Sequence, residues 1–218
     1  MRSIGRGLAT RSRQAPKART RSRDAGSRRT RRRRRNLALG VVGFVAVAAI
    51  GFAVLKPIVD DAVLELTLPL RHEDVIRQQA RAKDLDPALV AAVIYRESKF
   101  RDQTSDAGAK GYMQILPDTA KFIASRSGGT EFELRDLGDP QINISYGCWY
   151  LRYLIQRYDG NQVAAVAAYN AGHEHVDAWG GSALRKEDIR FPETREYVDD
   201  VFDKRQDYIK HYRSELGL

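Results

Sequence analysis

The pattern of apolar and polar residues divides the chain into three stretches. Residues 1–36 contain almost nothing apolar, whereas the following segment, LALGVVGFVAVAAIGFAVL at 37–55, is apolar and carries no charge. From about residue 71 onward, apolar residues recur three and four positions apart along several segments. This spacing is typical of amphipathic helices that bury one face against a common core. The third stretch is therefore expected to form a globular domain.

Capping residues mark the expected starts of two helices in this domain. Asp86 directly precedes Pro87, and Asp139 directly precedes Pro140. An aspartate side chain can accept a hydrogen bond from a free N–H group of the first helical turn, and proline fits the first helical position because no N–H is needed there. Each pair therefore predicts the start of a helix.

Three further segments predict a domain that is nearly all α. Residues 73–83 are amphipathic, and NQVAAVAAYNAG is expected to be helical between Asn161 and Gly172. Strand signals are almost absent; the GYMQI segment could form a short hairpin or an extended loop. A final helix is expected in FPETREYVDDVFDKRQDYIKHY, with one apolar face formed by Tyr197, Val198, Val201 and Phe202.

The uncharged segment 37–55 predicts a transmembrane helix. At a rise of about 1.5 Å per residue it spans about 28 Å, which is close to the roughly 30 Å thickness of the hydrocarbon core. The alternative is a cleaved signal peptide. Signal peptides usually have a short basic region and an apolar region of about 7–15 residues, whereas this run is longer and follows 36 residues. We therefore favour a retained anchor.

The net charge of +9 comes entirely from the first stretch. In residues 1–36 the basic residues far outnumber the acidic ones, of which Asp24 is the only one. The rest of the chain therefore carries more acidic than basic residues. Residues 1–36 are expected to be disordered. Because basic residues precede the apolar helix and Asp60, Asp61 and Glu65 follow it, the positive-inside rule places the N-terminus in the cytoplasm and everything from about Lys56 outside.

The basic tail is expected to set this topology and to rest on anionic lipid headgroups. Nucleic acid is not an expected partner, because no aromatic residues are interleaved with the arginines for base stacking. Four regions result, namely a disordered cytoplasmic tail at 1–36, a transmembrane helix at 37–55, a juxtamembrane connector at 56–70 and a globular domain at 71–218.

Glu97 interrupts the apolar face of a predicted helix. It follows Val90 by seven residues, so its carboxyl lies on the buried stripe near the end of the helix. Desolvation and the negative end of the helix dipole both favour the protonated form, which is the form that a general acid needs. The alternative is a structural glutamate that turns to the helix rim and pairs with Arg96 or Lys99. This segment alone supports both interpretations equally.

Four motifs read together favour the first interpretation. They are RESKF at 96–100, SDAGAKGYMQILPDTA at 105–120, AAYNAG at 167–172 and FPETREYV at 191–198. In this order and spacing they resemble the Slt-type lytic transglycosylases of bacterial cell walls, glycoside hydrolase family 23. The resemblance covers roughly residues 69–208 and implies a mainly α, lysozyme-like catalytic domain, similar to goose-type lysozyme. Together with the apolar segment 37–55, the expected fold is this domain preceded by a single N-terminal transmembrane helix.

The resemblance also implies roles for matching residues. Glu97 corresponds to the single catalytic acid/base, Tyr169 to a tyrosine whose hydroxyl bonds the catalytic carboxylate, and Tyr197 to a tyrosine that closes the groove. Plain core packing is an equally good interpretation of Met113. The expected substrate-binding residues are Ser105, Met113, Gln114, Tyr169, Asn170 and Tyr197.

The resemblance implies peptidoglycan glycan strands as the partner and the bond between N-acetylmuramic acid and N-acetylglucosamine as the target. Glu97 would protonate the leaving oxygen and then take the proton from the C6 hydroxyl of the same muramyl unit, which attacks C1. Most glycosidases need two carboxylates; here the sugar itself supplies the nucleophile. No cofactor is expected.

Two departures from the family pattern concern the groove wall rather than the chemistry. The chain has Tyr112 where the family commonly has leucine, and HEH at 173–175 where small or Pro-Gly residues are common. Two histidines two positions apart are not the i, i+4 pair of a helical zinc site, so no metal is expected there. The single cysteine, Cys148, is expected to be a small buried residue rather than a nucleophile.

Two rival functions remain open. A muramidase-type hydrolase on the same fold would use water and would need a second carboxylate, for which Asp102 and Asp106 are candidates by proximity in the sequence. An inactive peptidoglycan-binding module would tether membrane to wall. Such a module has no need for a desolvated acid, so Glu97, Gln114 and Tyr169 together argue against it.

Overall fold

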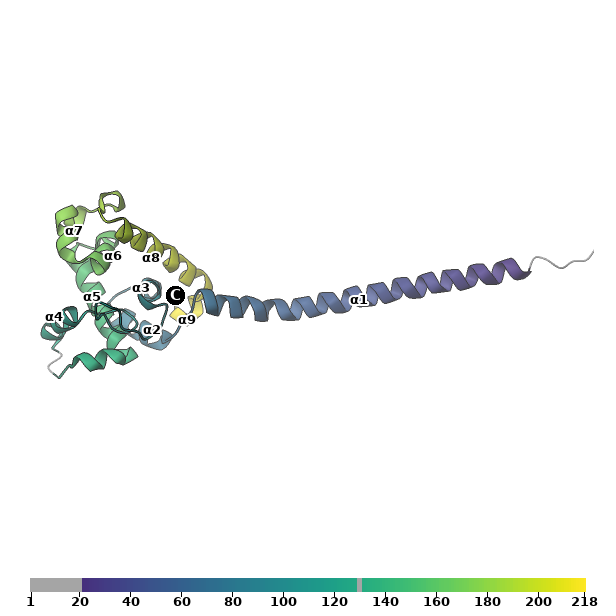
Figure 1. Ribbon diagram of the computed structural model, residues 1–218, viewed down its shortest axis with the longest axis horizontal. Coiled ribbons are helices and arrows are strands. Elements are labelled where there is room, and N and C mark those ends of the chain that lie inside the picture. Colours follow the sequence, from purple (N-terminus) through teal and green to yellow (C-terminus); the bar gives the residue numbers. More distant parts are fainter. Residues whose placement is uncertain (1–20, 129–130) are drawn as a thin grey trace, which may run out of the picture. The chain divides into compact units, whose positions relative to one another are not determined.

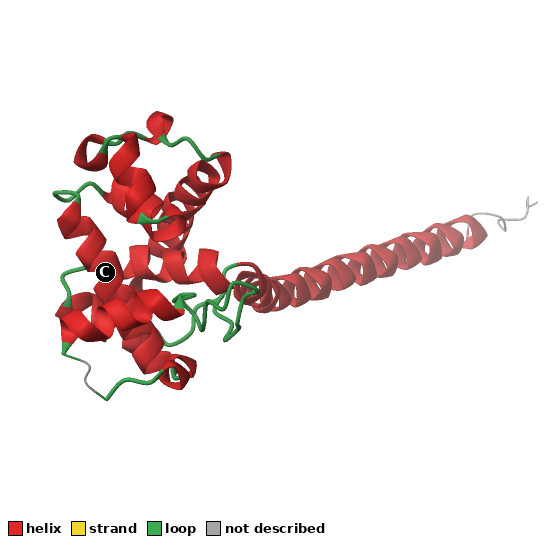
Figure 2. Ribbon diagram, turned by 60° about the vertical axis from the view of Figure 1, so that its left-hand side comes forward, coloured by secondary structure: helices red, strands yellow, loops and turns green. Residues whose placement is uncertain are grey.

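The computed structural model describes residues 21–128 and 131–218 (Figure 1). The chain divides into two compact units, with the boundary between Asp60 and Asp61. Across the residues described, the secondary structure is helical, with no strand (Figure 2). This confirms the predicted mainly α class.

The first unit contains most of helix α1 (Arg21–Thr67), which carries the uncharged segment 37–55. Its apolar side chains are exposed, including Leu39 at 63% and Phe44 at 75%. Among the residues described, the stretch Arg29–Thr67 is the one helix long and apolar enough to cross a membrane. The helical prediction for 37–55 is therefore confirmed, and membrane insertion would account for the exposed apolar surface.

Helix α1 is longer than the sequence indicates at both ends. Residues 21–36 are helical, so the prediction of disorder is wrong for this part of the basic tail; residues 1–20 lie outside the described residues. Arginine is a good helix former, and extending an existing helix avoids the cost of nucleation. The predicted connector at 56–70 is likewise helical as far as Thr67.

The end of the connector is held within the second unit. Leu68 is buried, and its carbonyl accepts a hydrogen bond from the hydroxyl of Tyr212 at 2.8 Å. The carbonyl of Pro69 accepts one from the hydroxyl of Tyr208 at 2.7 Å. These bonds fix where the chain enters the globular unit.

The second unit is built from α-helices and short 3-10 helices (Figures 1 and 2). In chain order after α1 they are α2 (Glu73–Ala82), α3 (Pro87–Ser98), α4 (Pro117–Ser127), η1 (Leu134–Gly138), α5 (Pro140–Arg157), α6 (Gln162–Ala171), α7 (His173–Trp179), η2 (Gly181–Ala183), η3 (Lys186–Asp188), α8 (Pro192–His211) and α9 (Arg213–Leu216).

The predicted caps are confirmed. The side chain of Asp86 accepts a hydrogen bond from the N–H of Ala88 at 2.8 Å, and that of Asp139 accepts one from Ile142 at 3.0 Å. Helix α2 ends one residue before the predicted boundary, and α6 lies within its predicted limits. Helix α8 matches the predicted last helix, but the short helix α9 follows it.

Helix α3 forms the centre of the second unit. Every residue from Ala88 to Ile94 is completely buried, and α3 packs against α2 and most extensively against α8. Helix α6 packs against both α5 and α8. Glu97 lies in the last turn of the central helix α3.

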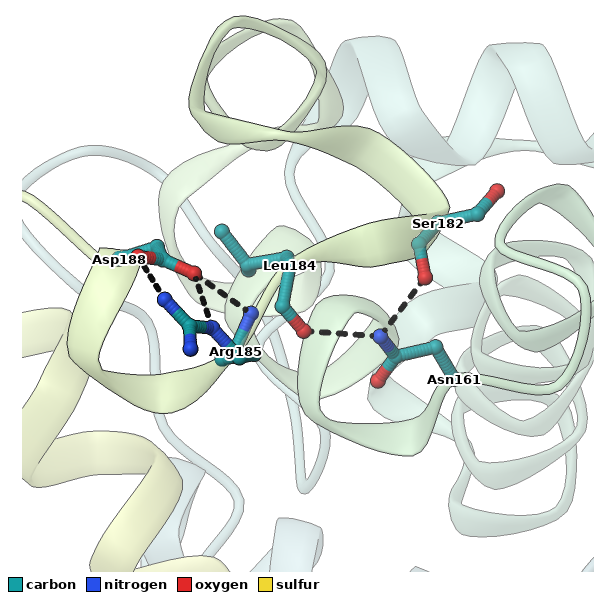
Figure 3. Close-up of polar contacts among 5 residues, drawn as sticks. All are labelled: Asn161, Ser182, Leu184, Arg185 and Asp188. Atoms are coloured by element: carbon teal, nitrogen blue, oxygen red, sulfur yellow. Dashed lines mark hydrogen bonds and ion pairs between the residues drawn. The ribbon is translucent and has the colours of Figure 1, made fainter.

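The connection from α7 to α8 is anchored on Asn161, at the start of α6 (Figure 3). Its side-chain nitrogen donates to the carbonyls of Ser182 at 3.0 Å and Leu184 at 2.9 Å. Its side-chain oxygen accepts from the N–H of Ala164 at 3.1 Å and so caps α6. One side chain therefore both starts α6 and fixes the segment that leads into α8.

Candidate active site

Glu97 lies in the last turn of α3 and is half-buried. The hydroxyl of Tyr197, on α8, donates a hydrogen bond of 2.6 Å to its Oε1 atom. Burial raises the pKa of Glu97 to about 7, although the Tyr197 hydrogen bond and the charge of Arg96 both act to lower it. A carboxyl group with this pKa holds its proton in a large fraction of molecules near neutral pH.

Arg96 is one of the two cations, with Lys99, that the structural interpretation offered as a partner for Glu97. Its guanidinium forms an ion pair with Asp200 on α8, with Nε and Oδ2 3.1 Å apart. The same guanidinium lies 5.7 Å from the centre of the Tyr197 ring. Arg96 therefore supports the tyrosine that bonds Glu97.

Tyr169 does not make the hydrogen bond predicted for it. Its hydroxyl donates to the carbonyl of Met113 at 3.0 Å, and a phenol has only one proton to donate. Burial raises the pKa of Tyr169, and the charge of Glu97 raises it further, so the two side chains lie close enough to interact electrostatically. The tyrosine that donates to the carboxylate is thus Tyr197, not Tyr169.

Met113 belongs to the core. Its side chain is fully buried, and a Cβ atom added to Gly147 on α5 would lie 2.2 Å from its sulfur. Its backbone N–H donates to the side-chain oxygen of Asn143 at 2.8 Å. Met113 therefore contributes its carbonyl, which holds Tyr169, rather than a substrate-lining side chain.

The segment between α3 and α4 is a folded loop rather than a hairpin. Isolated bridges pair Thr104 with Lys110 and Lys110 with Ile115. Ser105 closes a turn by accepting a hydrogen bond from the N–H of Ala109 at 3.1 Å. Ser105 is half-buried within that turn.

Gln114 stabilises the same loop and also borders a pocket. Its backbone has a φ of +49°, and its side-chain nitrogen donates to the carbonyls of Gln103 and Gly111 at 3.0 and 2.8 Å. Together with Tyr169 and Asn170 it lines a cavity of about 190 Å³. Three of the predicted residues are thereby brought together.

Asn170 connects two helices near this pocket. Its side-chain oxygen accepts a hydrogen bond of 2.8 Å from the hydroxyl of Thr194 on α8. Thr194 is buried, although sequence reasoning gave it no role. Its place in the FPETREYV motif was the available signal.

Two further residues that position the site were missed. Ser98 follows Glu97 and is buried; its hydroxyl donates to the carbonyl of Tyr112 at 2.7 Å and ties the loop to α3. Asn143 is fully buried on α5, and its side-chain nitrogen donates to the carbonyls of Lys110 and Leu137 at 2.9 and 3.1 Å. A buried amide on an apolar helix face was the signal for Asn143.

The remaining candidates take no part in this cluster of contacts. Asp102 and Asp106 are exposed on the loop. The ring of His175 contacts those of Trp179 and Phe191, and within the described ranges no group of three or more His, Cys, Asp or Glu side chains is arranged to hold a metal ion. Cys148 is buried, and burial raises its pKa to about 12, so its thiol stays protonated.

Sequence comparison finds relatives of the globular unit. The family profile described as "Transglycosylase SLT domain" matches residues 74–191. A "Soluble lytic murein transglycosylase" from Salmonella typhimurium is 33% identical over 163 residues, which cover 71% of this chain and 25% of that protein. A "Membrane-bound lytic murein transglycosylase F" from Pseudomonas fluorescens is 33% identical over 121 residues, which cover 52% of this chain and 23% of that protein.

Structural comparison agrees. The chain is similar to the lytic transglycosylase Slt from Pseudomonas aeruginosa, with a TM-score of 0.64 and 31% identity over 69% of this chain and 26% of that one. It is also similar to the 70 kDa soluble lytic transglycosylase from Escherichia coli, with a TM-score of 0.63 and 33% identity over 67% and 25%. This chain spans about a quarter of the length of these relatives. The lysozyme-like fold class is confirmed.

Proposed function

The chain belongs to the transglycosylase SLT domain family, and from that membership we propose that it is a membrane-anchored lytic transglycosylase. Its substrate is peptidoglycan, and it cleaves the β-1,4 bond between N-acetylmuramic acid and N-acetylglucosamine without water. The observation that carries this proposal is Glu97, half-buried with a pKa raised to about 7 and bonded through Oε1 by Tyr197.

Glu97 acts twice in the proposed mechanism. Its Oε1 atom accepts the hydrogen bond of Tyr197, so the transferable proton is carried by Oε2. Glu97 first gives this proton to the glycosidic oxygen as the bond to C1 of the muramyl unit breaks. As a carboxylate it then removes the proton of the C6 hydroxyl, whose oxygen attacks C1 and closes a 1,6-anhydro ring.

One carboxylate is sufficient because the nucleophile belongs to the substrate. A hydroxyl held in the same sugar ring reacts at a high effective concentration, so no second carboxylate is required to activate water. The exposed positions of Asp102 and Asp106 give the hydrolytic alternative no support. After ring closure Glu97 is protonated again and ready for another turnover.

Product analysis tests the reaction. The full chain in detergent should release muropeptides that end in 1,6-anhydromuramic acid, as measured by mass spectrometry. Glu97→Gln should lower the rate at least about a hundredfold, within the usual contribution of general acid catalysis. Glu187→Gln, a matched change at an exposed glutamate, should retain activity. Products with only reducing ends would identify a hydrolase, and an active Glu97→Gln variant would exclude the acid/base role.

We also propose that residues 37–55 cross the cytoplasmic membrane, with the N-terminus inside and the globular unit outside. The apolar exposed surface of α1 and the basic residues that precede it support this orientation. Protease added to spheroplasts should digest the globular unit and spare an N-terminal tag. A soluble external protein without its tag would instead identify segment 37–55 as a cleaved signal.

A further inference from the structure

A second pocket lies on α5, and the proposed reaction does not use it. It has a volume of about 370 Å³ and is lined by Trp149, Arg152, Tyr153 and Gln156 of α5 together with Ala82 and Lys83 at the end of α2. Glu97, Tyr169 and Tyr197 are not among its lining residues.

The aromatic residues of this pocket are held in a fixed arrangement. The rings of Trp149 and Tyr153 are stacked, with an interplanar angle of 5° and centres 5.7 Å apart. Phe122 on α4 supports both rings edge-on, with centre distances of 6.1 and 5.2 Å. Trp149 and Tyr153 remain half-buried, so part of this ordered aromatic surface faces the pocket. An ordered aromatic surface binds a ligand with little further loss of conformational entropy.

Two cations border the aromatic surface. The guanidinium of Arg152 is oriented by Asp84, donating to its carbonyl at 3.1 Å and pairing with its carboxylate at 3.3 Å. The ammonium group of Lys83 bonds the neutral amide of Gln79. Burial lowers the pKa of Lys83, because desolvation disfavours its charged form. A carboxylate in the pocket would favour that charged form.

A row of aromatic rings joins this pocket to the one lined by Gln114, Tyr169 and Asn170. Tyr150 lines the latter pocket, and its ring contacts those of Tyr169 and Tyr153, with centre distances of 5.6 and 6.1 Å. Tyr153 in turn lines the α5 pocket. Tyr150 and Tyr153, about one turn apart on α5, therefore line one pocket each, and a single polymer chain could contact both pockets.

We propose that the α5 pocket binds a carboxylate-bearing peptide stem of the peptidoglycan strand whose glycan occupies the Glu97 site. The carboxylate lies between Lys83 and Arg152, and the apolar part of the stem lies on Trp149. This assignment rests on the proposed function. The Glu97 site then selects the bond that is cleaved, whereas the α5 pocket increases affinity for strands that carry peptides.

Co-sedimentation with purified cell-wall sacculi tests the assignment. The full chain in detergent carries Glu97→Gln throughout, so that the polymer is not degraded. The double substitution Lys83→Gln/Arg152→Gln should weaken binding by about tenfold or more, because it removes two charge-assisted contacts. Arg190→Gln/Lys210→Gln removes the same charge from exposed positions elsewhere and should change binding less than about twofold by screening alone.

Binding to a second polymer identifies the chemical group that the α5 pocket recognises. On glycan strands stripped of their peptides by an amidase, the chain with intact Lys83 and Arg152 and the double variant should bind equally. Lys83→Arg, which keeps the charge, should retain binding to intact sacculi, and circular dichroism should show that all variants are folded.

The outcomes separate this assignment from the proposed function. The peptide-stem assignment would be overturned if the double variant bound intact sacculi as well as the chain with Lys83 and Arg152 does. It would also be overturned if the double substitution weakened binding equally on intact and on stripped strands. Neither result would affect the release of anhydro products as evidence for the reaction. Failure of the wild-type chain to release those products would instead reject the proposed function.

Discussion

Helices α1 and α3 contain similar apolar runs in opposite surroundings. Leu39 of α1 is 63% exposed, whereas Leu89 of α3 is completely buried by protein. The run in α1 contains no ionisable residue between 37 and 55, whereas the run in α3 leads directly to Glu97. Apolar composition alone therefore does not indicate a protein core; the packed neighbours of each helix decide its role.

The difference explains what each helix can do. Exposed apolar area costs about 25 cal/mol per Å² in water, so the surface of α1 favours a lipid environment and suits an anchor. The surface of α3 is already covered by α2 and α8, and the resulting low dielectric acts on Glu97 instead. The apolar surface of α1 would thus be covered by lipid, whereas the apolar surroundings of α3 are protein and raise the pKa of Glu97.

The largest expected effect comes from matched leucine substitutions. Leu89→Ala should lower the free energy of unfolding of the globular unit by about 2–5 kcal/mol, because it opens a cavity in a packed core. Leu39→Ala should leave that value unchanged, because its side chain contacts no core. Chemical denaturation of the full chain in detergent, followed by tryptophan fluorescence, measures both. Equal effects would show that the contrast between α1 and α3 is wrong.

A smaller effect concerns the pH dependence of stability. The native chain binds the proton of Glu97 more tightly than the unfolded chain does, since burial raises its pKa from 4.5 to about 7. The stabilising contribution is therefore complete below about pH 4.5 and is lost as the pH rises through about 7. Above pH 7 the folded state carries a desolvated carboxylate.

Glu97→Gln should therefore make the globular unit more stable than wild type at pH 8, by about 2–3 kcal/mol, and similar in stability at pH 4. Denaturation curves at the two pH values measure this difference. Glu187→Gln, a matched change at an exposed side chain, should leave the free energy of unfolding close to that of wild type. A Glu97→Gln variant that gained nothing at pH 8 would contradict the raised pKa.

The sequence was sufficient for features that depend on local chemistry. Asp86 and Asp139 predict where their helices begin, because a capping side chain accepts hydrogen bonds from N–H groups only two or three residues away. The burial of Glu97 followed from helical periodicity, because the spacing from Val90 fixes the face on which it lies. The extent of α1 was underestimated, because helix propagation into residues 21–36 depends on the apolar helix that follows.

The partners within the site depend on contacts between distant segments. Tyr169 and Tyr197 both lie in recognised motifs, but which hydroxyl reaches Glu97 depends on how α6 and α8 pack against α3. The roles of Ser98 and Asn143 depend on the path of the loop between α3 and α4, which has no regular periodicity from which it could be derived. Met113 illustrates the same limit, because its position in a motif does not distinguish a buried side chain from a groove residue.

The smallest expected effect distinguishes the roles of Tyr197 and Tyr169 near Glu97. Tyr197→Phe removes a hydrogen bond that lowers the pKa of Glu97, so the basic limb of the pH–rate profile should move to higher pH. Turnover should fall by about tenfold, because the loss of a bond to a charged group costs about 1.5–3 kcal/mol and only part of it is specific to the transition state.

Tyr169→Phe instead leaves the carbonyl of Met113 without its donor. That change should cost about 1–3 kcal/mol of stability and leave the pH–rate profile in place. Measuring kcat against pH together with the unfolding free energy distinguishes the two variants. A shifted profile in Tyr169→Phe, with an unshifted one in Tyr197→Phe, would exchange their roles and restore the interpretation that the sequence motifs alone suggested.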